Sequence, residues 1–165
     1  MRCGIIENMA REISPATETD APYILAFIQR YFPYFKIDLD TLLRRMKHPY
    51  FIYFRALENE DFAGYVELQI MDPVSRVIRL NAIAVSEKFQ GKGIGQALLE
   101  YAEMEAQRLT MRKMTLLVQK DNMGAKELYK KNKFKFIKMH TRKIGGKPAE
   151  VWAKKMELEA PAYVH

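Results

Sequence analysis

The sequence predicts an α/β (α+β) fold, with a mixed, mostly antiparallel twisted sheet of about seven strands and helices on both faces. Three observations lead to this prediction. Helix-like and strand-like apolar runs alternate along the chain. An acidic turn, residues 58–61, joins two runs rich in aromatic and β-branched residues, which is typical of a hairpin. A strand, a glycine-rich loop, a helix and a strand then follow one another in residues 75–119, which predicts a βαβ crossover and a parallel pair.

The first half of the chain predicts one strand, two helices and a hairpin. Residues 9–14 form a strand that ends in a Ser-Pro turn, and residues 17–32 form a helix with Asp20 as its N-cap and Pro22 in its first turn. A second helix, 38–48, ends at Pro49. The hairpin strands are 50–58 and 62–71, and a third strand, 75–85, is apolar enough at its end to be buried on both faces.

The second half alternates helices with strands. Apolar residues at helical spacing predict a helix over 93–109, and "KMTLLVQ" predicts a strand over 113–119. A helix over 122–132 and a strand over 134–140 follow, and a turn over 143–148 leads into a last strand over 150–156. The expected order is therefore β-α-α-β-β-β-α-β-α-β-β.

Size and composition restrict the classes of protein to which this chain can belong. The 165 residues suit one domain, 1–165, with a core of about residues 10–157. The single cysteine, Cys3, excludes an intrachain disulfide and a cysteine-rich zinc site. No signal-peptide pattern and no apolar run of ~18–20 residues is present, so we expect a cytoplasmic protein that does not bind a membrane.

The net charge of +7 is uneven along the chain. Residues 112–155 hold fourteen Lys or Arg and three acidic residues. Such a basic half is compatible with an anionic cofactor, nucleic acid or an acidic partner, or with a solvated surface rich in lysine.

Glycines at alternate positions, Gly91, Gly93 and Gly95, separate the third strand from the following helix. Free amides at a helix start bind phosphate, and glycines let the backbone approach it closely. Lys92 can add charge. A tight turn without a ligand is the alternative. The spacing fits neither a Walker loop nor the dinucleotide fingerprint.

The loop "QGKGIG", residues 90–95, resembles the Gln/Arg-x-x-Gly-x-Gly/Ala signature of the GNAT superfamily of N-acetyltransferases. "NMGAKELYKKNKF", residues 122–134, is similar to that family's Asn-x-x-Ala-x-x-Leu-Tyr unit. The resemblance is strong from residue 81 to residue 134, and the predicted element order is also the family's. It implies a GNAT-like fold with a central βαβ unit that binds acetyl-CoA, and no metal.

The resemblance also implies roles for individual residues. Backbone groups of Ile83, Ala84 and Val85 would contact the pantetheine arm, and an amide near Val85 would face the oxyanion. The residues expected to hold the pyrophosphate are Gln90, Gly91, Lys92, Gly93, Ile94, Gly95 and Gln96. Asn122 would contact the cofactor and also cap its helix. Tyr129 would be the general acid that protonates the departing thiolate, with a core tyrosine as the alternative.

This sequence departs from the family's pattern at two places. Where several members carry a glutamate base, these strands hold Arg79, Asn81 and Gln119. Glu67 on the neighbouring strand is the first candidate for the base, ahead of Glu150 and His140, and a water relay is equally compatible. Lys133 stands where the family usually has glycine, and we expect Asn132 to take the left-handed conformation there at a modest cost in stability.

The acceptor end is expected at the first two helices and the last loop. Aromatic residues there, Tyr31, Phe32, Tyr34 and Phe35, would wall an apolar or cation-accepting slot, or would only pack the end of the helix. The last loop, residues 140–148, is basic and lacks tyrosines. This disfavours a protein N-terminus, and its charge also disfavours a polycation.

The leading hypothesis is an acetyl-CoA-dependent N-acetyltransferase that moves an acetyl group to a primary amine, of a small molecule or a protein, by direct attack in a ternary complex. Its partners would be acetyl-CoA and an amine acceptor, with a homodimer left open. The alternatives are a non-catalytic acyl-CoA-binding or sensing domain and, last, a basic RNA- or ribosome-associated module. Cys3 lies in an expected tail, which argues against an acyl-cysteine intermediate.

Overall fold

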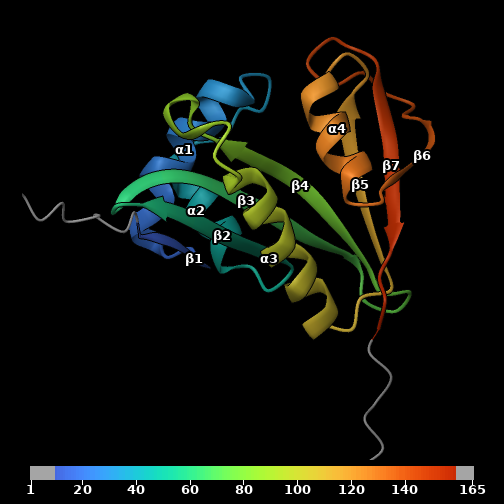
Figure 1. Ribbon diagram of the computed structural model, residues 1–165, viewed down its shortest axis with the longest axis horizontal. Helices are drawn as coiled ribbons and strands as arrows, with labels where there is room; N and C mark the ends of the chain where they lie inside the picture. The colour runs from blue at the N-terminus through green and yellow to red at the C-terminus, as the bar shows by residue number, and fades with distance from the viewer. Residues whose placement is uncertain (1–9, 159–165) are drawn as a thin grey trace, which may run out of the picture.

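A computed structural model describes residues 10–158, which form one seven-stranded sheet with helices on both faces (Figure 1). The strand order is β1-β2-β3-β4-β5-β7-β6, and only the β4–β5 pair is parallel. In chain order the elements are β1 (Arg11–Pro15), the 3₁₀ turn η1 (Glu18–Asp20), α1 (Ala21–Tyr31), α2 (Leu39–Lys47), β2 (Phe51–Glu58), β3 (Asp61–Asp72), β4 (Val77–Val85), the 3₁₀ turn η2 (Glu87–Phe89), α3 (Ile94–Arg108), β5 (Lys113–Gln119), α4 (Met123–Lys131), β6 (Lys135–Met139) and β7 (Ala149–Lys155). The predicted order and fold class are confirmed.

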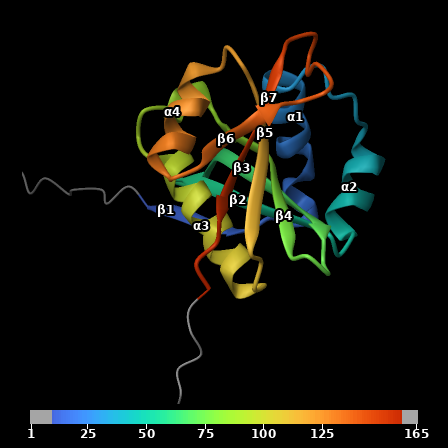
Figure 2. The same cartoon turned by 90° about the vertical axis from the view of Figure 1, so that its right-hand side faces the viewer.

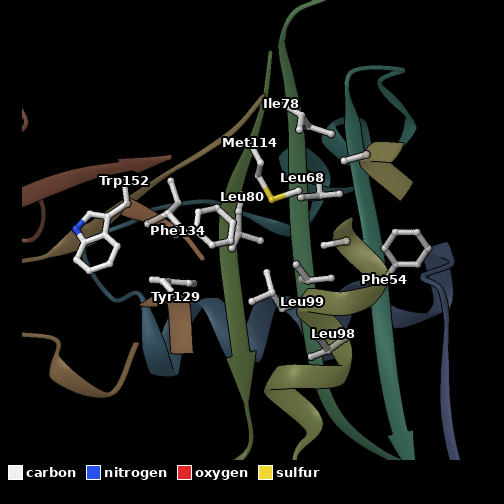
Figure 3. Packing of buried hydrophobic residues seen from close by; sticks show 14 of the residues in the cluster. Phe54, Leu68, Ile78, Leu80, Leu98, Leu99, Met114, Tyr129, Phe134 and Trp152 are labelled. Atoms are coloured by element: carbon white, nitrogen blue, oxygen red, sulfur yellow. The ribbon is translucent and has the colours of Figure 1, made fainter. Parts of the chain in front are cut away.

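The helices divide between the two faces of the sheet (Figure 2). One apolar cluster joins α3 and α4 to the sheet, and Figure 3 shows part of it, with Leu98 and Leu99 on α3 and Leu68 and Leu80 on the strands. A second cluster joins α1 and α2 to the opposite face. Each face of the central strands is therefore covered by a different pair of helices.

The sheet opens between β4 and β5. Their parallel ladder runs from Val77 and Lys113 to Leu80 and Leu116 and stops there, although β4 continues to Val85 and β5 to Gln119. The two strands lie together at one end and separate toward the other (Figure 1).

A β-bulge lies where the two strands separate. On β3, Glu67 pairs with Ala82 and Leu68 pairs with Leu80, so Asn81 is an extra residue on β4. A bulge bends its strand and increases the local twist. The bulge therefore accounts for the departure of β4 from β5.

Asp20 is the N-cap residue of α1 as expected, but its side chain does not bond to that helix; its carboxylate accepts from the Thr17 amide and pairs with Arg55 instead. Two other local expectations are wrong. The end of β4 is not buried on both faces, since residues 81–83 are half-buried beside the opening. At the end of α4 the left-handed residue is Lys133, with φ +68°, whereas Asn132 has φ −95°.

Two expectations concern features outside these elements. Cys3 lies outside the described residues. No helix within residues 10–158 is long and apolar enough to cross a membrane.

Candidate active site

A cavity of about 380 Å³ occupies the opening between β4 and β5. Its walls come from both faces of the sheet, because the α1–α2 side and α4 both contribute. From the α1–α2 side come Tyr31, Phe32, Tyr34, Phe35 and Arg45, and from the α4 side Asn122, Ala125 and Tyr129. The cavity is thus a passage through the sheet, with one end under α1 and α2 and the other beside α4.

The glycine loop precedes α3 and presents unpaired backbone donors. Gly91 and Gly93 have φ +77° and +81°, a conformation that disfavours residues with a Cβ. The first intrahelical bond runs from the Ala97 amide to the Gly93 carbonyl. The amides of residues 91–96 find no acceptor within residues 10–158. Six such donors at the positive end of a helix form a site suited to a phosphate group.

Several bonds hold this loop in place. The Gln90 side chain donates to the Val85 carbonyl at 3.1 Å, which ties the loop to the end of β4. Arg11 of β1 donates to the Lys92 carbonyl at 2.8 Å and forms an ion pair with Glu58 at 3.0 Å. Sequence reasoning missed Arg11, because 81 residues separate it from Lys92 and no local pattern marks the contact.

Of the other loop residues, Ile94 and Gln96 make structural contacts, and Gly95 has free space beside it. Ile94 is buried in the core. Gln96 exchanges two amide hydrogen bonds with Asn132, both at 2.8 Å, so its side chain links α3 to the end of α4. Gly95 has room for a methyl group, since the nearest atom to an added Cβ would be 3.8 Å away.

Asn122, at the start of α4, and Tyr129, within this helix, line the cavity. The Asn122 side chain accepts from the Ala125 amide at 3.2 Å, which confirms it as the N-cap of α4. Tyr129 is 6% exposed and packs edge-on against Phe134. Burial raises the pKa of the Tyr129 phenol above its ordinary value, so the hydroxyl stays protonated at neutral pH. This hydroxyl makes no hydrogen bond in the part of the chain that the structure describes.

Glu67 reaches the cavity from β3 and is 6% exposed. One carboxylate oxygen, Oε1, accepts from Arg45 Nε at 2.5 Å and from the Tyr53 hydroxyl at 2.6 Å. The Arg45 guanidinium also lies 4.1 Å from the centre of the Phe51 ring, so it is held on two sides. The second oxygen, Oε2, accepts no hydrogen bond from residues 10–158.

The two other candidate bases do not line the cavity. Glu150 is buried elsewhere, where it pairs with Lys126 at 3.1 Å and accepts from the Trp152 indole at 3.0 Å. His140 is absent from the cavity walls as well.

The β6–β7 loop packs over the side of the cavity where the acceptor was expected. Ile144 lines the cavity, and its carbonyl accepts from the Gln119 side chain at 3.0 Å. Gly145, with φ +57°, lies against Tyr34, since an added Cβ would be 2.7 Å from the Tyr34 ring. The four aromatic residues predicted for the acceptor side all line the cavity, and the last loop, which was also expected there, forms a roof against Tyr34.

Two further polar residues in the walls lack partners. The Tyr65 hydroxyl and Arg79 Nε are buried and make no hydrogen bond with the described residues. Within residues 10–158 no group of three or more His, Cys, Asp or Glu is placed to hold a metal ion.

Known proteins resemble this chain in sequence and in fold. Residues 8–134 match the model of the Acetyltransferase (GNAT) family. A mycothiol acetyltransferase from Jonesia denitrificans is 32% identical over 105 residues, which are 60% of this chain and 33% of that protein. The chain therefore spans about a third of the length of this relative.

Solved structures share the fold at low identity. The ribosomal-protein-S18-alanine N-acetyltransferase from Escherichia coli superposes with a TM-score of 0.77 and 22% identity, over 94% of this chain and 100% of that one. Ard1 from Thermoplasma volcanium gives 0.80 and 18%, over 90% and 99%. A spermidine N-acetyltransferase from Vibrio cholerae, solved with CoA and spermine, gives 0.75 and 18%, over 88% and 95%.

Proposed function

Because the chain belongs to the acetyltransferase (GNAT) family, we propose that it transfers an acetyl group from acetyl-CoA to a primary amine by direct attack in a ternary complex. The observation that carries the proposal is the passage through the sheet. It brings a buried phenol and a carboxylate to one cavity, and the helix start with free amides follows β4, one of the strands that wall this cavity.

The cofactor end is formed by β4, the glycine loop and α4. Amides of residues 91–96 would hold the pyrophosphate, with Lys92 adding charge. Backbone groups of residues 83–85 would hold the pantetheine arm, because β4 beyond Leu80 has no ladder partner on its β5 side. Asn122 would contact the arm from the start of α4.

The chemistry would take place where the bulge, Glu67 and Tyr129 meet the cavity. Acetyl-CoA, when bound, supplies an activated thioester carbonyl to the attacking amine. Glu67 would accept the proton of the amine through Oε2, directly or through a water molecule, while Arg45 and Tyr53 hold Oε1 in place. The Tyr129 hydroxyl would donate a proton to the thiolate, and an amide of β4 near Val85 would stabilise the oxyanion.

Two measurements on the purified protein test this proposal. Calorimetric titration with CoA should give saturable binding, and an assay of thiol release from acetyl-CoA should respond to some members of a panel of amines. Binding without release for every amine would indicate a binding or sensing domain. Absence of binding would contradict the proposed cofactor site.

A pair of glycine variants tests the loop itself. Gly93→Ala forces a side chain into the left-handed region at a cost of about 1–2 kcal/mol. The free loop is expected to relieve this strain by leaving the conformation that presents its amides, and CoA must then restore that conformation, so we expect about tenfold weaker CoA binding. Gly95→Ala is the matched control, because this glycine has an ordinary φ and space for a methyl group. Equal CoA affinity of both variants would argue against a pyrophosphate site on these amides.

A further inference from the structure

Arg79 is a cation without a partner in the wall of the cavity. Its Nε atom is buried and makes no hydrogen bond with residues 10–158, and no carboxylate in that range lies within 4.0 Å of its guanidinium. Burial lowers the pKa of Arg79, as expected for a charge that has lost water without gaining an anion. Leaving a charge partly desolvated and unpaired is costly, so such a group in a cavity indicates a missing ligand.

Arg79 belongs to the acceptor end of the passage. Its neighbours on β4, Ile78 and Leu80, are buried in the cluster under α3 and α4. Side chains alternate along a strand, so Arg79 points to the opposite face, which α1 and α2 cover. Its partner across the ladder is Gln69 of β3, which lines the same cavity.

The charges in the cavity wall do not cancel. Arg45 and Glu67 form an ion pair, which leaves the charge of Arg79 uncompensated. A polyamine would bring further positive charge into this wall. A ligand with an anionic group would instead complete it.

The spacing of these groups sets the size of such a ligand. Glu67 is two residues from Gln69 along β3, so Glu67 and Arg79 are diagonal neighbours, about 7–8 Å apart at the backbone. The unpartnered hydroxyl of Tyr65, which is 1% exposed, lies two residues beyond Glu67 on the same face. An amine at Glu67 and a carboxylate at Arg79 would thus fit one small molecule. The roof formed by Gly145 against Tyr34 and the volume of about 380 Å³ agree with a small acceptor.

We propose that the acceptor is a small amine that carries a carboxylate close to its amino group, as an α-amino acid does, and that Arg79 binds this carboxylate while Glu67 faces the amine. The inference rests on the proposed acetyl transfer. Arg79 is then the residue that selects the acceptor, since a guanidinium binds a planar carboxylate through two parallel hydrogen bonds.

The test uses pairs of acceptors in the thiol-release assay. L-amino acids with different side chains are compared with their carboxamides, and spermidine is included as a polycation. For each protein, the kcat/KM for the amino acid is divided by the kcat/KM for its carboxamide. The two acceptors differ in amine basicity, but this difference cancels when the resulting ratio is compared between variants. We expect Arg79→Gln to lower the ratio by roughly 10- to 100-fold and Arg79→Lys to lower it less.

A control and a folding check keep the test decisive. Arg112→Gln removes an exposed arginine outside the cavity and should leave the ratio unchanged. CoA titration of each variant reports whether the cofactor end is intact. If Arg79→Gln does not fold, Arg79→Lys and the acid-to-carboxamide comparison in the unaltered protein still decide the question.

Two outcomes would overturn the inference, and they differ. Efficient acetylation of carboxamides or spermidine, with a ratio insensitive to Arg79, refutes the carboxylate site and leaves acetyl transfer standing. Absence of thiol release with every amine, while CoA still binds, refutes the acetyl transfer and the inference with it.

Discussion

Replacement of Tyr129 by phenylalanine distinguishes a catalytic role of the hydroxyl from a packing role of the ring. The substitution removes one oxygen atom and keeps the ring, which packs edge-on against Phe134 with 5.8 Å between the ring centres. The hydroxyl makes no hydrogen bond within residues 10–158, so no protein partner is left unsatisfied. We therefore expect the free energy of unfolding to change by no more than about 0.5 kcal/mol.

The expected loss of activity is much larger. A positioned general acid contributes about 10²–10⁴ in rate, which corresponds to about 2.7–5.4 kcal/mol of transition-state stabilisation. Because burial raises the pKa of Tyr129, the unaltered protein holds the proton at neutral pH, and the variant cannot supply it. The assay is thiol release at saturating acetyl-CoA and amine, with CoA affinity measured separately by calorimetry.

Tyr101→Phe is the matched control for this experiment. Tyr101 is 38% exposed, packs against Phe54 and does not line the cavity, so its variant should keep the kcat of the unaltered protein. A Tyr129→Phe protein that binds CoA normally and has a kcat within about threefold of the control would refute the general-acid assignment.

The other predictions concern stability. Lys133→Gly should raise the free energy of unfolding by about 0.5–1 kcal/mol in a denaturant titration. The reason is that relief of about 1–2 kcal/mol of left-handed strain at Lys133 exceeds the entropy cost of glycine. A destabilised variant would show that this strain is absent. Gly64→Ala should cost about 1–3 kcal/mol and lower the melting temperature, since its Cβ would lie 2.5 Å from the Ala84 carbonyl oxygen; unchanged melting would mean that the strands separate freely. Burial raises the pKa of Tyr53 and of Tyr65 above the ~10 of an exposed phenol, so the stability that they confer is complete below about pH 10 and is lost as the pH rises toward their folded-state values. Denaturant titrations across alkaline pH should show this fall, and a flat profile would contradict it.

The sequence predicted the features that depend on nearby residues. Apolar periodicity specified most helices and strands, because burial of one face follows directly from spacing, although β6 is exposed along its whole length. The loop around Gly91 and Gly93 was also predictable, since a positive φ at a helix start is a local requirement that glycine meets. Asn122 could be identified as a cap for the same reason.

The features that the sequence did not predict depend on contacts between distant segments. The bond from Arg11 to the Lys92 carbonyl joins β1 to the start of α3 and has no local signal. Likewise, Glu67 stood out as a carboxylate near the site, but its pairing with Arg45 needed the packing of α2 on the sheet. The strand pattern around Arg79 predicted its position in β4. It did not predict that Arg79 has no acidic neighbour among the described residues.

The backbone conformation after α4 shows a second reason why a prediction from the sequence failed. Asn tolerates the left-handed region better than Lys, which made Asn132 the expected residue. In the structure the Asn132 amide instead bonds to Gln96 of α3, and the left-handed turn falls on Lys133. A distant hydrogen bond thus outweighed a local preference.

If the two reactants bind as proposed, the passage through the sheet also bears on the order in which the products leave. Acetyl-CoA would lie toward α4 and the amine toward α1 and α2, because the walls of the cavity come from both sides of the sheet. Neither product would then have to leave before the other, and we expect product-inhibition kinetics without a compulsory sequence of release.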